Sequence, residues 1–173
     1  MAARDLILDP AEIDFDHVIA GIEEIRRFNP QRFEMEQLTA IVHFDSERMI
    51  CVGYKDISDE EFWIRGHMPG APLMPGVLMC EAAAQLAGFF VARADLMKGR
   101  LLGFGGLDEV RFRDTVSPGD RLVVVAQQLK VRPGTMLICR FQAFVRESLV
   151  CEGQLRGIAL PEELLAKPPS DPA

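Results

Sequence analysis

The sequence predicts an α+β fold in which one long central helix is wrapped by a curved antiparallel β-sheet. Two observations support this prediction. Residues 76–97 are apolar almost throughout, which is typical of a helix that the rest of its fold encloses. Residues 101–160 read as strand after strand with short turns between them, and such strands pair antiparallel because parallel neighbours need long crossovers.

The segment before the sheet predicts a helix. Asp9-Pro10 resembles an N-cap followed by proline at the first helical position. Val18, Ile22 and Ile25 then recur at helical spacing. Asn29-Pro30 is expected to end this helix, because the residue before a proline is pushed out of the α region.

Strands are expected on both sides of the long helix. Alternating apolar residues and turn signals predict strands at 38–44, 48–57, 101–112, 121–131, 136–147 and 149–160. The turns between them are expected at 46–47, 117–120 and 132–135. Residues 58–76 are dense in glycine and proline, so they are expected to form an irregular connection into the helix.

Length and composition limit the possible functions. The 173 residues suit one domain, and we expect an N-terminal extension at 1–20, a single domain at 21–162 and a flexible tail at 163–173. A net charge of −7 argues against a nucleic-acid surface, because phosphate binding needs clustered Lys and Arg. Although twenty residues from 73 to 92 are nearly all apolar, Glu81 among them would be costly in a bilayer. We therefore expect a buried helix and no membrane insertion.

The cysteines indicate a reducing compartment. Cys51, Cys80, Cys139 and Cys151 form no C-x-x-C pair, and no secretory signal is visible, so free thiols in the cytoplasm are expected. A zinc site would need closer ligand spacing and more than three scattered histidines. The residues therefore argue against a zinc site.

The strongest functional signal lies where the irregular segment enters the helix. His67 stands in a Pro/Gly loop that can hold its ring in one orientation, and the loop leads into a helix N-terminus that favours negative charge. Glu81 follows in apolar surroundings, which disfavour an ionised carboxylate. Gln85 lies one turn further on and could hydrogen-bond Glu81. A neutral histidine and a protonated glutamate are a base and an acid that can act together.

This stretch resembles the signature of the (3R)-hydroxyacyl-acyl-carrier-protein dehydratases, G-H-F-P-G-x-P-x-x-P-G-V-L followed by E-A-x-A-Q. The matching residues are Gly66, His67, Pro69, Gly70, Pro72, Pro75, Gly76, Val77, Leu78, Glu81, Ala82, Ala84 and Gln85. Further similarity covers Lys55–Trp63 and Val110–Asp120, so the resemblance extends over roughly residues 20 to 160.

The resemblance implies a hot-dog fold and a dehydratase of fatty acid biosynthesis that turns 3-hydroxyacyl thioesters on acyl carrier protein into trans-2-enoyl thioesters. It also implies a homodimer, or a trimer of such dimers, and a reaction that requires no metal and no organic cofactor. His67 of one subunit would take the proton from C2, and Glu81 of the other would protonate the leaving hydroxyl. The Gly76 N–H would polarise the thioester carbonyl, and Gln85 would orient Glu81. Arg111 and Arg113 are candidates for docking the acidic carrier protein.

The sequence departs from the family pattern at Met68, where the family has Phe, and at Gln31, where it usually has His. Three other interpretations stay open. A related dehydratase–isomerase branch normally has Asp at the position of Glu81. A non-catalytic paralogue that binds acyl thioesters would have no need of a buried acid. Hot-dog thioesterases generally lack the signature between His67 and Gly76.

Overall fold

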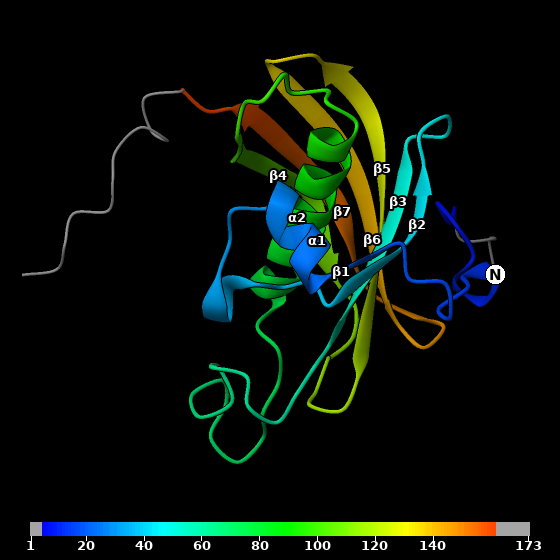
Figure 1. Ribbon diagram of the computed structural model, residues 1–173. Helices are drawn as coiled ribbons and strands as arrows, with labels where there is room; N and C mark the ends of the chain where they lie inside the picture. Colours follow the sequence, from blue (N-terminus) through cyan, green and yellow to red (C-terminus); the bar gives the residue numbers. More distant parts are fainter. Residues whose placement is uncertain (1–4, 162–173) are drawn as a thin grey trace, which may run out of the picture.

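A computed structural model describes residues 5–161, and over this range a seven-stranded antiparallel sheet curves around one long helix (Figure 1). The predicted α+β architecture is confirmed. The expected flexible tail at 163–173 lies outside the described residues.

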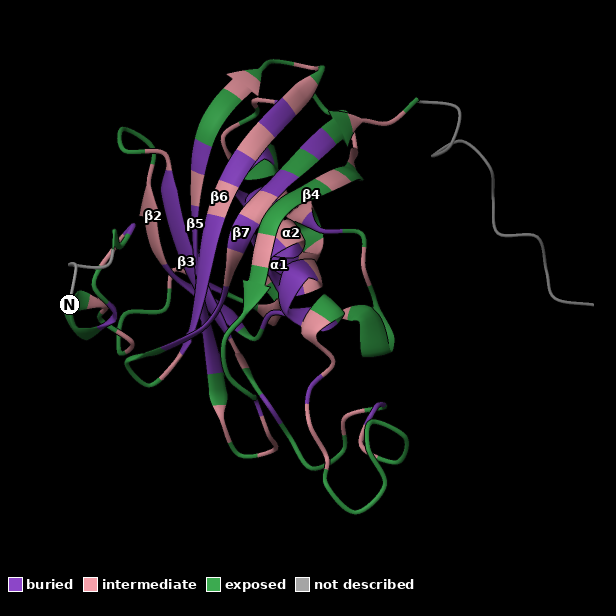
Figure 2. Cartoon of the chain, turned by 180° about the vertical axis from the view of Figure 1, so that it is seen from behind, coloured by how far each residue is buried: buried purple, intermediate pink, exposed green. Residues whose placement is uncertain are grey.

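Every neighbouring pair of strands in the sheet is antiparallel, in the order β1-β2-β3-β5-β6-β7-β4. The strands are β1 (Ala20–Gly21), β2 (Ala40–Asp45), β3 (Ile50–Asp56), β4 (Leu102–Phe112), β5 (Arg121–Arg132), β6 (Met136–Val145) and β7 (Ser148–Ala159). The six expected strands are therefore present to within a few residues. Consecutive strands are not always neighbours, because β4 pairs with β7 at the sheet edge while β5 pairs with β3 and β6. Figure 2 shows β4 exposed along much of its length.

The predicted N-terminal helix is wrong in its extent. Asp9 does cap a helical turn, and its Oδ1 accepts from the Ala11 N–H at 3.0 Å, but that turn is only the 3₁₀ helix η1 (Pro10–Glu12). Asp14 Oδ1 then accepts from the Asp16 N–H, a local bond that competes with helix formation. Ile19 N–H donates to the β2 carbonyl of residue 41, so the chain here joins the sheet. The α-helix α1 covers only Ile22–Phe28 and ends before Pro30 as expected.

The long helix α2 (Gly76–Arg93) is four residues shorter than predicted. Asp95 adopts φ 52°, a left-handed conformation that an α-helix cannot continue through. The Asp95 N–H donates to the Ala92 carbonyl and the Leu96 N–H to the Val91 carbonyl, the two bonds of a Schellman motif. The helix therefore stops where its last carbonyls find partners just beyond its end.

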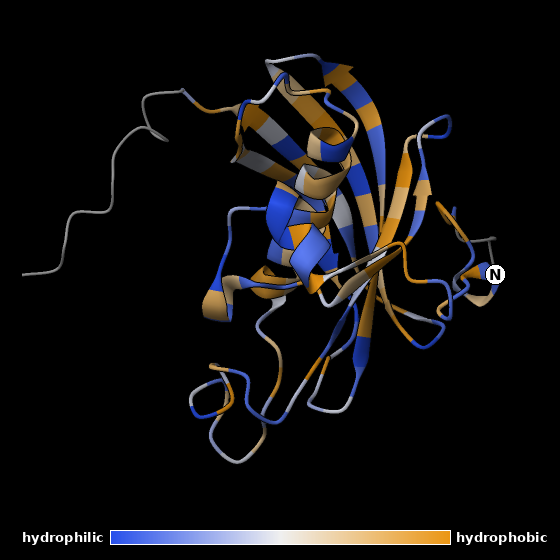
Figure 3. Ribbon diagram, viewed as in Figure 1, coloured by the Kyte–Doolittle hydropathy of each residue, from blue (hydrophilic) through white to orange (hydrophobic). Residues whose placement is uncertain are grey.

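The sheet is apolar on both faces. Its inner face packs on α2 around Leu86, Phe89 and Phe90, which are fully buried. In Figure 3 α2 and the strands that face it are largely apolar, whereas α1 is mainly hydrophilic. By length and hydropathy α2 could also cross a membrane, but 61% of it is buried inside the fold, as befits a core helix.

Residues 5–19 cover the outer face of the sheet. The Ile7 N–H donates to Gln142 Oε1 at 2.9 Å, and Ile7 packs in a second apolar cluster with strand residues of β2, β3, β5 and β6. The Phe15 ring meets Tyr54 edge-on at 6.1 Å between centroids, and the Arg121 guanidinium lies 3.9 Å from the centre of the Tyr54 ring. The segment expected as an N-terminal extension is thus packed against the sheet.

Candidate active site

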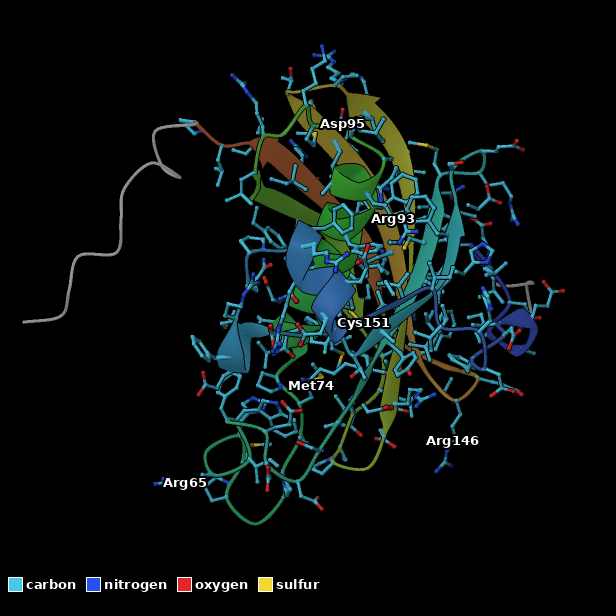
Figure 4. The ribbon with its side chains drawn as sticks, in the orientation of Figure 1. Arg65, Met74, Arg93, Asp95, Arg146 and Cys151 are labelled. Atoms are coloured by element: carbon cyan, nitrogen blue, oxygen red, sulfur yellow. The ribbon has the colours of Figure 1, made fainter. Side chains whose placement is uncertain are left out.

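The irregular segment 57–75 carries His67 in a series of tight turns below the start of α2 (Figure 1). Trp63 is 4% exposed and anchors the segment in the core. Its carbonyl accepts from the N–H groups of Gly66 at 3.1 Å and His67 at 2.8 Å. In Figure 4 the labelled Arg65 marks the part of the loop that projects from the body of the molecule. The buried indole thus fixes the backbone that presents the histidine.

The His67 ring is held in one tautomer by its own loop. Nδ1 lies 2.8 Å from the Leu73 carbonyl oxygen. A carbonyl oxygen only accepts hydrogen bonds, so Nδ1 must be the protonated nitrogen. In the neutral ring Nε2 then keeps its lone pair, and the exposed imidazole is oriented to act as a base through that atom.

Gly76 begins α2 beside His67. The first N–H groups of a helix have no acceptor within the helix, so this end can receive negative charge. A Cβ at Gly76 would lie only 2.7 Å from the Phe112 ring, which explains the glycine. Gly76, His67, Leu73 and Phe112 line one cavity of about 380 Å³ with mostly apolar neighbours.

Glu81 is held by Gln85 through the hydrogen bond that their spacing predicted. Gln85 Nε2 donates to Glu81 Oε1 at 2.8 Å and to the Met35 carbonyl at 2.7 Å. Gln85 Oε1 accepts from the Gln37 N–H at 2.9 Å. The Gln85 side chain is buried and its amide oxygen and nitrogen are both bonded to residues 35–37, so the orientation of the Glu81 carboxyl depends on the backbone of that segment.

Glu81 faces a second cavity, of about 130 Å³, between α2 and the chain before and after it. Asn29, Gln31 and Gln85 contribute polar groups to its wall, and β4 and β7 contribute apolar ones. Glu81 is only half-buried because the face of α2 that also carries Ala84 is open towards this cavity. The helix is therefore wrapped on all sides except this one.

The two predicted catalytic groups line different cavities. His67 lines the cavity at the N-terminus of α2, and Glu81 lines the cavity along its side. These two cavities have no lining residue in common. The structure of the single chain therefore places the two residues apart, one in each cavity.

Arg111 and Arg113, the candidate docking residues, lie next to acidic side chains. Arg113 Nε donates to Glu152 Oε1 at 2.9 Å, and this contact lowers the pKa of Glu152 below its usual range. Arg111 lines a hollow with Glu109 and Glu152, together with Asp5 and Arg140. Neither arginine belongs to a purely basic surface.

A buried ion pair was missed in the sequence. Lys55 Nζ, on β3, lies 3.1 Å from Glu61 Oε1, in the His67 segment, and the two side chains are 12% and 9% exposed. Their six-residue separation gives no local signal of contact, since it fits neither helix nor strand spacing. Within residues 5–161 no three side chains of His, Cys, Asp or Glu gather as a metal site would require.

Comparisons with known proteins identify the family. Residues 29–154 match the family model described as FabA-like domain. The 3-hydroxyacyl-[acyl-carrier-protein] dehydratase FabZ of Pelotomaculum thermopropionicum is 37% identical over 134 residues, which are 78% of this chain and 94% of that protein. The bifunctional enzyme LpxC/FabZ of Chlorobaculum tepidum is 38% identical over 141 residues, and the chain spans 29% of its length.

A solved structure supports the fold. The dehydratase heterocomplex ApeI:P of Xenorhabdus doucetiae matches with a TM-score of 0.69 at 14% identity, over 82% of this chain and 94% of that one. At this identity the likeness concerns the fold alone. Together with the single long helix and the antiparallel sheet around it, it confirms the expected hot-dog fold.

Proposed function

Because the chain belongs to the FabA-like family together with the FabZ dehydratases, we propose that it removes water from (3R)-3-hydroxyacyl thioesters on acyl carrier protein. The products are trans-2-enoyl thioesters for fatty acid biosynthesis. The observations that support this best are a histidine whose Nδ1 is hydrogen-bonded to a backbone carbonyl and a glutamate whose carboxyl is hydrogen-bonded by Gln85. Both stand beside cavities that could admit an acyl chain.

In the proposed reaction His67 Nε2 takes the proton from C2 of the acyl group. Glu81 donates a proton to the 3-hydroxyl, the C3–O bond breaks, and water leaves as the C2–C3 double bond forms. The Gly76 N–H, at the start of α2, donates to the thioester oxygen as negative charge develops there. Gln85 keeps the Glu81 carboxyl in place. This chemistry uses only groups of the protein.

We propose that the working unit is a homodimer, or a trimer of such dimers, with His67 of one chain facing Glu81 of its partner. The separate cavities of the two residues support this arrangement. Large apolar side chains around the His67 cavity are also left uncovered in one chain, with Val77 69% exposed and Phe112 52% exposed. A second subunit would cover them.

The carrier protein is proposed to dock near Arg111 and Arg113, although Glu152 already neutralises part of that charge. The cytoplasm is the proposed location, and four free, buried cysteines are in keeping with it.

The proposed function is tested by following enoyl-thioester absorbance with 3-hydroxyacyl-acyl carrier protein as substrate. Wild type should turn over, and His67→Ala and Glu81→Gln should each lose nearly all activity while staying folded. Absence of turnover in wild type with every chain length tried would favour a subunit that binds acyl thioesters without converting them. Release of free thiol would instead favour a thioesterase.

Mixing the two inactive variants tests the shared site. A mixed dimer of His67→Ala and Glu81→Gln chains has one doubly damaged site and one intact site. Random exchange should therefore restore about one quarter of wild-type activity. No recovery in dimers shown to be mixed would mean that both residues act within one chain.

A further inference from the structure

The largely buried Lys55–Glu61 pair stands between the two halves of the proposed site. Charged groups are expensive to bury, and losing one partner of such a pair leaves the other uncompensated. Of the two side chains, neither is more than 12% exposed. The pair therefore ties strand β3, which carries Lys55, to the His67 segment, which carries Glu61.

Through Glu61 the ion pair is attached to the loop that carries His67. Glu61 Oε1 also accepts a long hydrogen bond from the Ser58 N–H at 3.5 Å, and the Glu61 carbonyl accepts from the Ile64 N–H at 3.1 Å. Two residues after Glu61, the Trp63 carbonyl binds the His67 N–H. The turns that present the imidazole thus begin at the residue that Lys55 holds.

On the other side Lys55 reaches the segment that holds Glu81. Lys55 Nζ donates to the Glu36 carbonyl at 3.2 Å. The neighbouring backbone groups, the Met35 carbonyl and the Gln37 N–H, are the two that grip Gln85. We call residues 35–37 the junction. Its central side chain is itself fixed, because Arg26 donates to the Glu36 carboxylate at 2.7 and 3.0 Å.

We infer that Lys55 is a positioning residue that holds both halves of the active site, the His67 loop through Glu61 and the Glu81 carboxyl through the junction and Gln85. The inference rests on the proposed function. In the proposed dimer, His67 and Glu81 of one chain serve different sites. Each Lys55 therefore supports the base of one site and the acid of the other.

The next residue on β3 provides a matched control. Adjacent residues of a strand point to opposite faces, and Asp56 pairs with Arg121 at 2.6 Å on the outer face, where Arg121 also lies over Tyr54. Asp56→Asn removes an ion pair one residue away from Lys55 without touching the junction or the His67 loop. Its kcat should stay at the wild-type value.

The first test compares kcat and KM in unmixed enzyme. Lys55→Met alone leaves the Glu61 charge buried and could impair folding, so the double variant Lys55→Met/Glu61→Met is made as well, since apolar replacement of both partners is often tolerated. We expect the folded double variant to lose about 10- to 100-fold in kcat with little change in KM, as displaced catalytic groups would. Wild-type kcat in the folded double variant would overturn the inference.

The second test separates the two arms in mixed dimers. The working site of a His67→Ala and Glu81→Gln dimer takes Glu81 from the first chain and His67 from the second. With Lys55→Met/Glu61→Met in the first chain, the experiment tests the effect of Lys55 on Glu81. With the same change in the second chain, it tests the effect of Lys55 on His67. Both placements should lower the rate. A parental rate for either placement would overturn the claim that Lys55 serves both halves.

Wild-type turnover, measured first, separates the failure of this inference from the failure of the proposed function. An inactive wild type overturns the proposed function and the inference with it. An active wild type whose Lys55 variants turn over equally fast overturns the inference alone.

Discussion

Gln85 and Glu81 are joined by a 2.8 Å hydrogen bond across one turn of α2, and two backbone groups also hold the Gln85 amide. The Gln85 amide oxygen accepts from the backbone of the junction (residues 35–37), and its amide nitrogen donates both to the junction and to the Glu81 carboxyl. The acid of the proposed reaction is therefore oriented by backbone atoms nearly fifty residues away in sequence.

Replacing Gln85 should affect stability and rate together. Gln85→Met leaves the buried Gln37 N–H without its partner, at about 1–3 kcal/mol, and also removes the donor to the Met35 carbonyl. It also frees the Glu81 carboxyl, so kcat should fall roughly tenfold. Denaturant unfolding and steady-state kinetics measure the two effects.

Gln128→Met is the matched control for this change. Gln128 is equally buried, but its amide has no oxygen or nitrogen partner among the described residues. Its replacement should cost less stability and leave kcat unchanged. Equal effects at both positions would show that the Glu81 contact has no special role.

Gly76→Ala should strain the start of α2. The new Cβ would lie 2.7–2.9 Å from three atoms of the Phe112 ring, and such overpacking typically costs about 1–3 kcal/mol. The displaced N–H should also lower kcat/KM. Thermal unfolding measures the first effect. Phe112→Ala added to Gly76→Ala should restore stability, and a double variant no more stable than the single one would place the strain elsewhere.

Stability should fall in acid through the junction. The hydrogen bond from Arg26 lowers the pKa of Glu36 below its usual value of 4.5. A carboxyl with a lowered pKa in the folded state stabilises the fold above its unfolded pKa, and this contribution is lost as the pH falls through the folded pKa. Unfolding free energy should therefore decrease below about pH 4.5. Glu36→Gln should be less stable at pH 7 and less sensitive between pH 5 and pH 3, and a slope equal to that of wild type would contradict this.

The cysteines should resist modification in the native protein. Burial raises the pKa of Cys139 to about 12 and that of Cys51 further, so neither forms the reactive thiolate at pH 8. All four cysteines are buried and free. Mass spectrometry after iodoacetamide treatment should find no native labelling of Cys51 and Cys139, and labelling of all four after denaturation. Fast native labelling at either position would mean that this part of the core opens readily.

Patterns within short stretches of sequence predicted those elements whose contacts also lie within short stretches of sequence. The alternation in β2 and β3 and the apolar run of α2 each follow from contacts that a short window of sequence contains. The helix expected from Asp9 failed because Ile19 bonds to β2, a contact that no local pattern announces. The position of β4 beyond β7 is also a long-range result.

The candidate site divides in the same way. The bond between Gln85 and Glu81 was predictable because it spans four residues of one helix. The grip of the junction on Gln85, and the tie from Lys55 to Glu61, join segments that the sequence separates. Of the two departures from the family pattern, Gln31 precedes residues 35–37 and Met68 follows His67 in the loop that contains Glu61.

The packing of residues 5–19 on the outer face of the sheet separates two meanings of the word domain. The module shared with the family begins at residue 29, as judged by the family match. The chain that shields both faces of the sheet from solvent begins at least as early as Ile7. The family match and the packed structure therefore give different domain boundaries. A chain cut at the start of the family match would lack the residues that cover the outer face of the sheet.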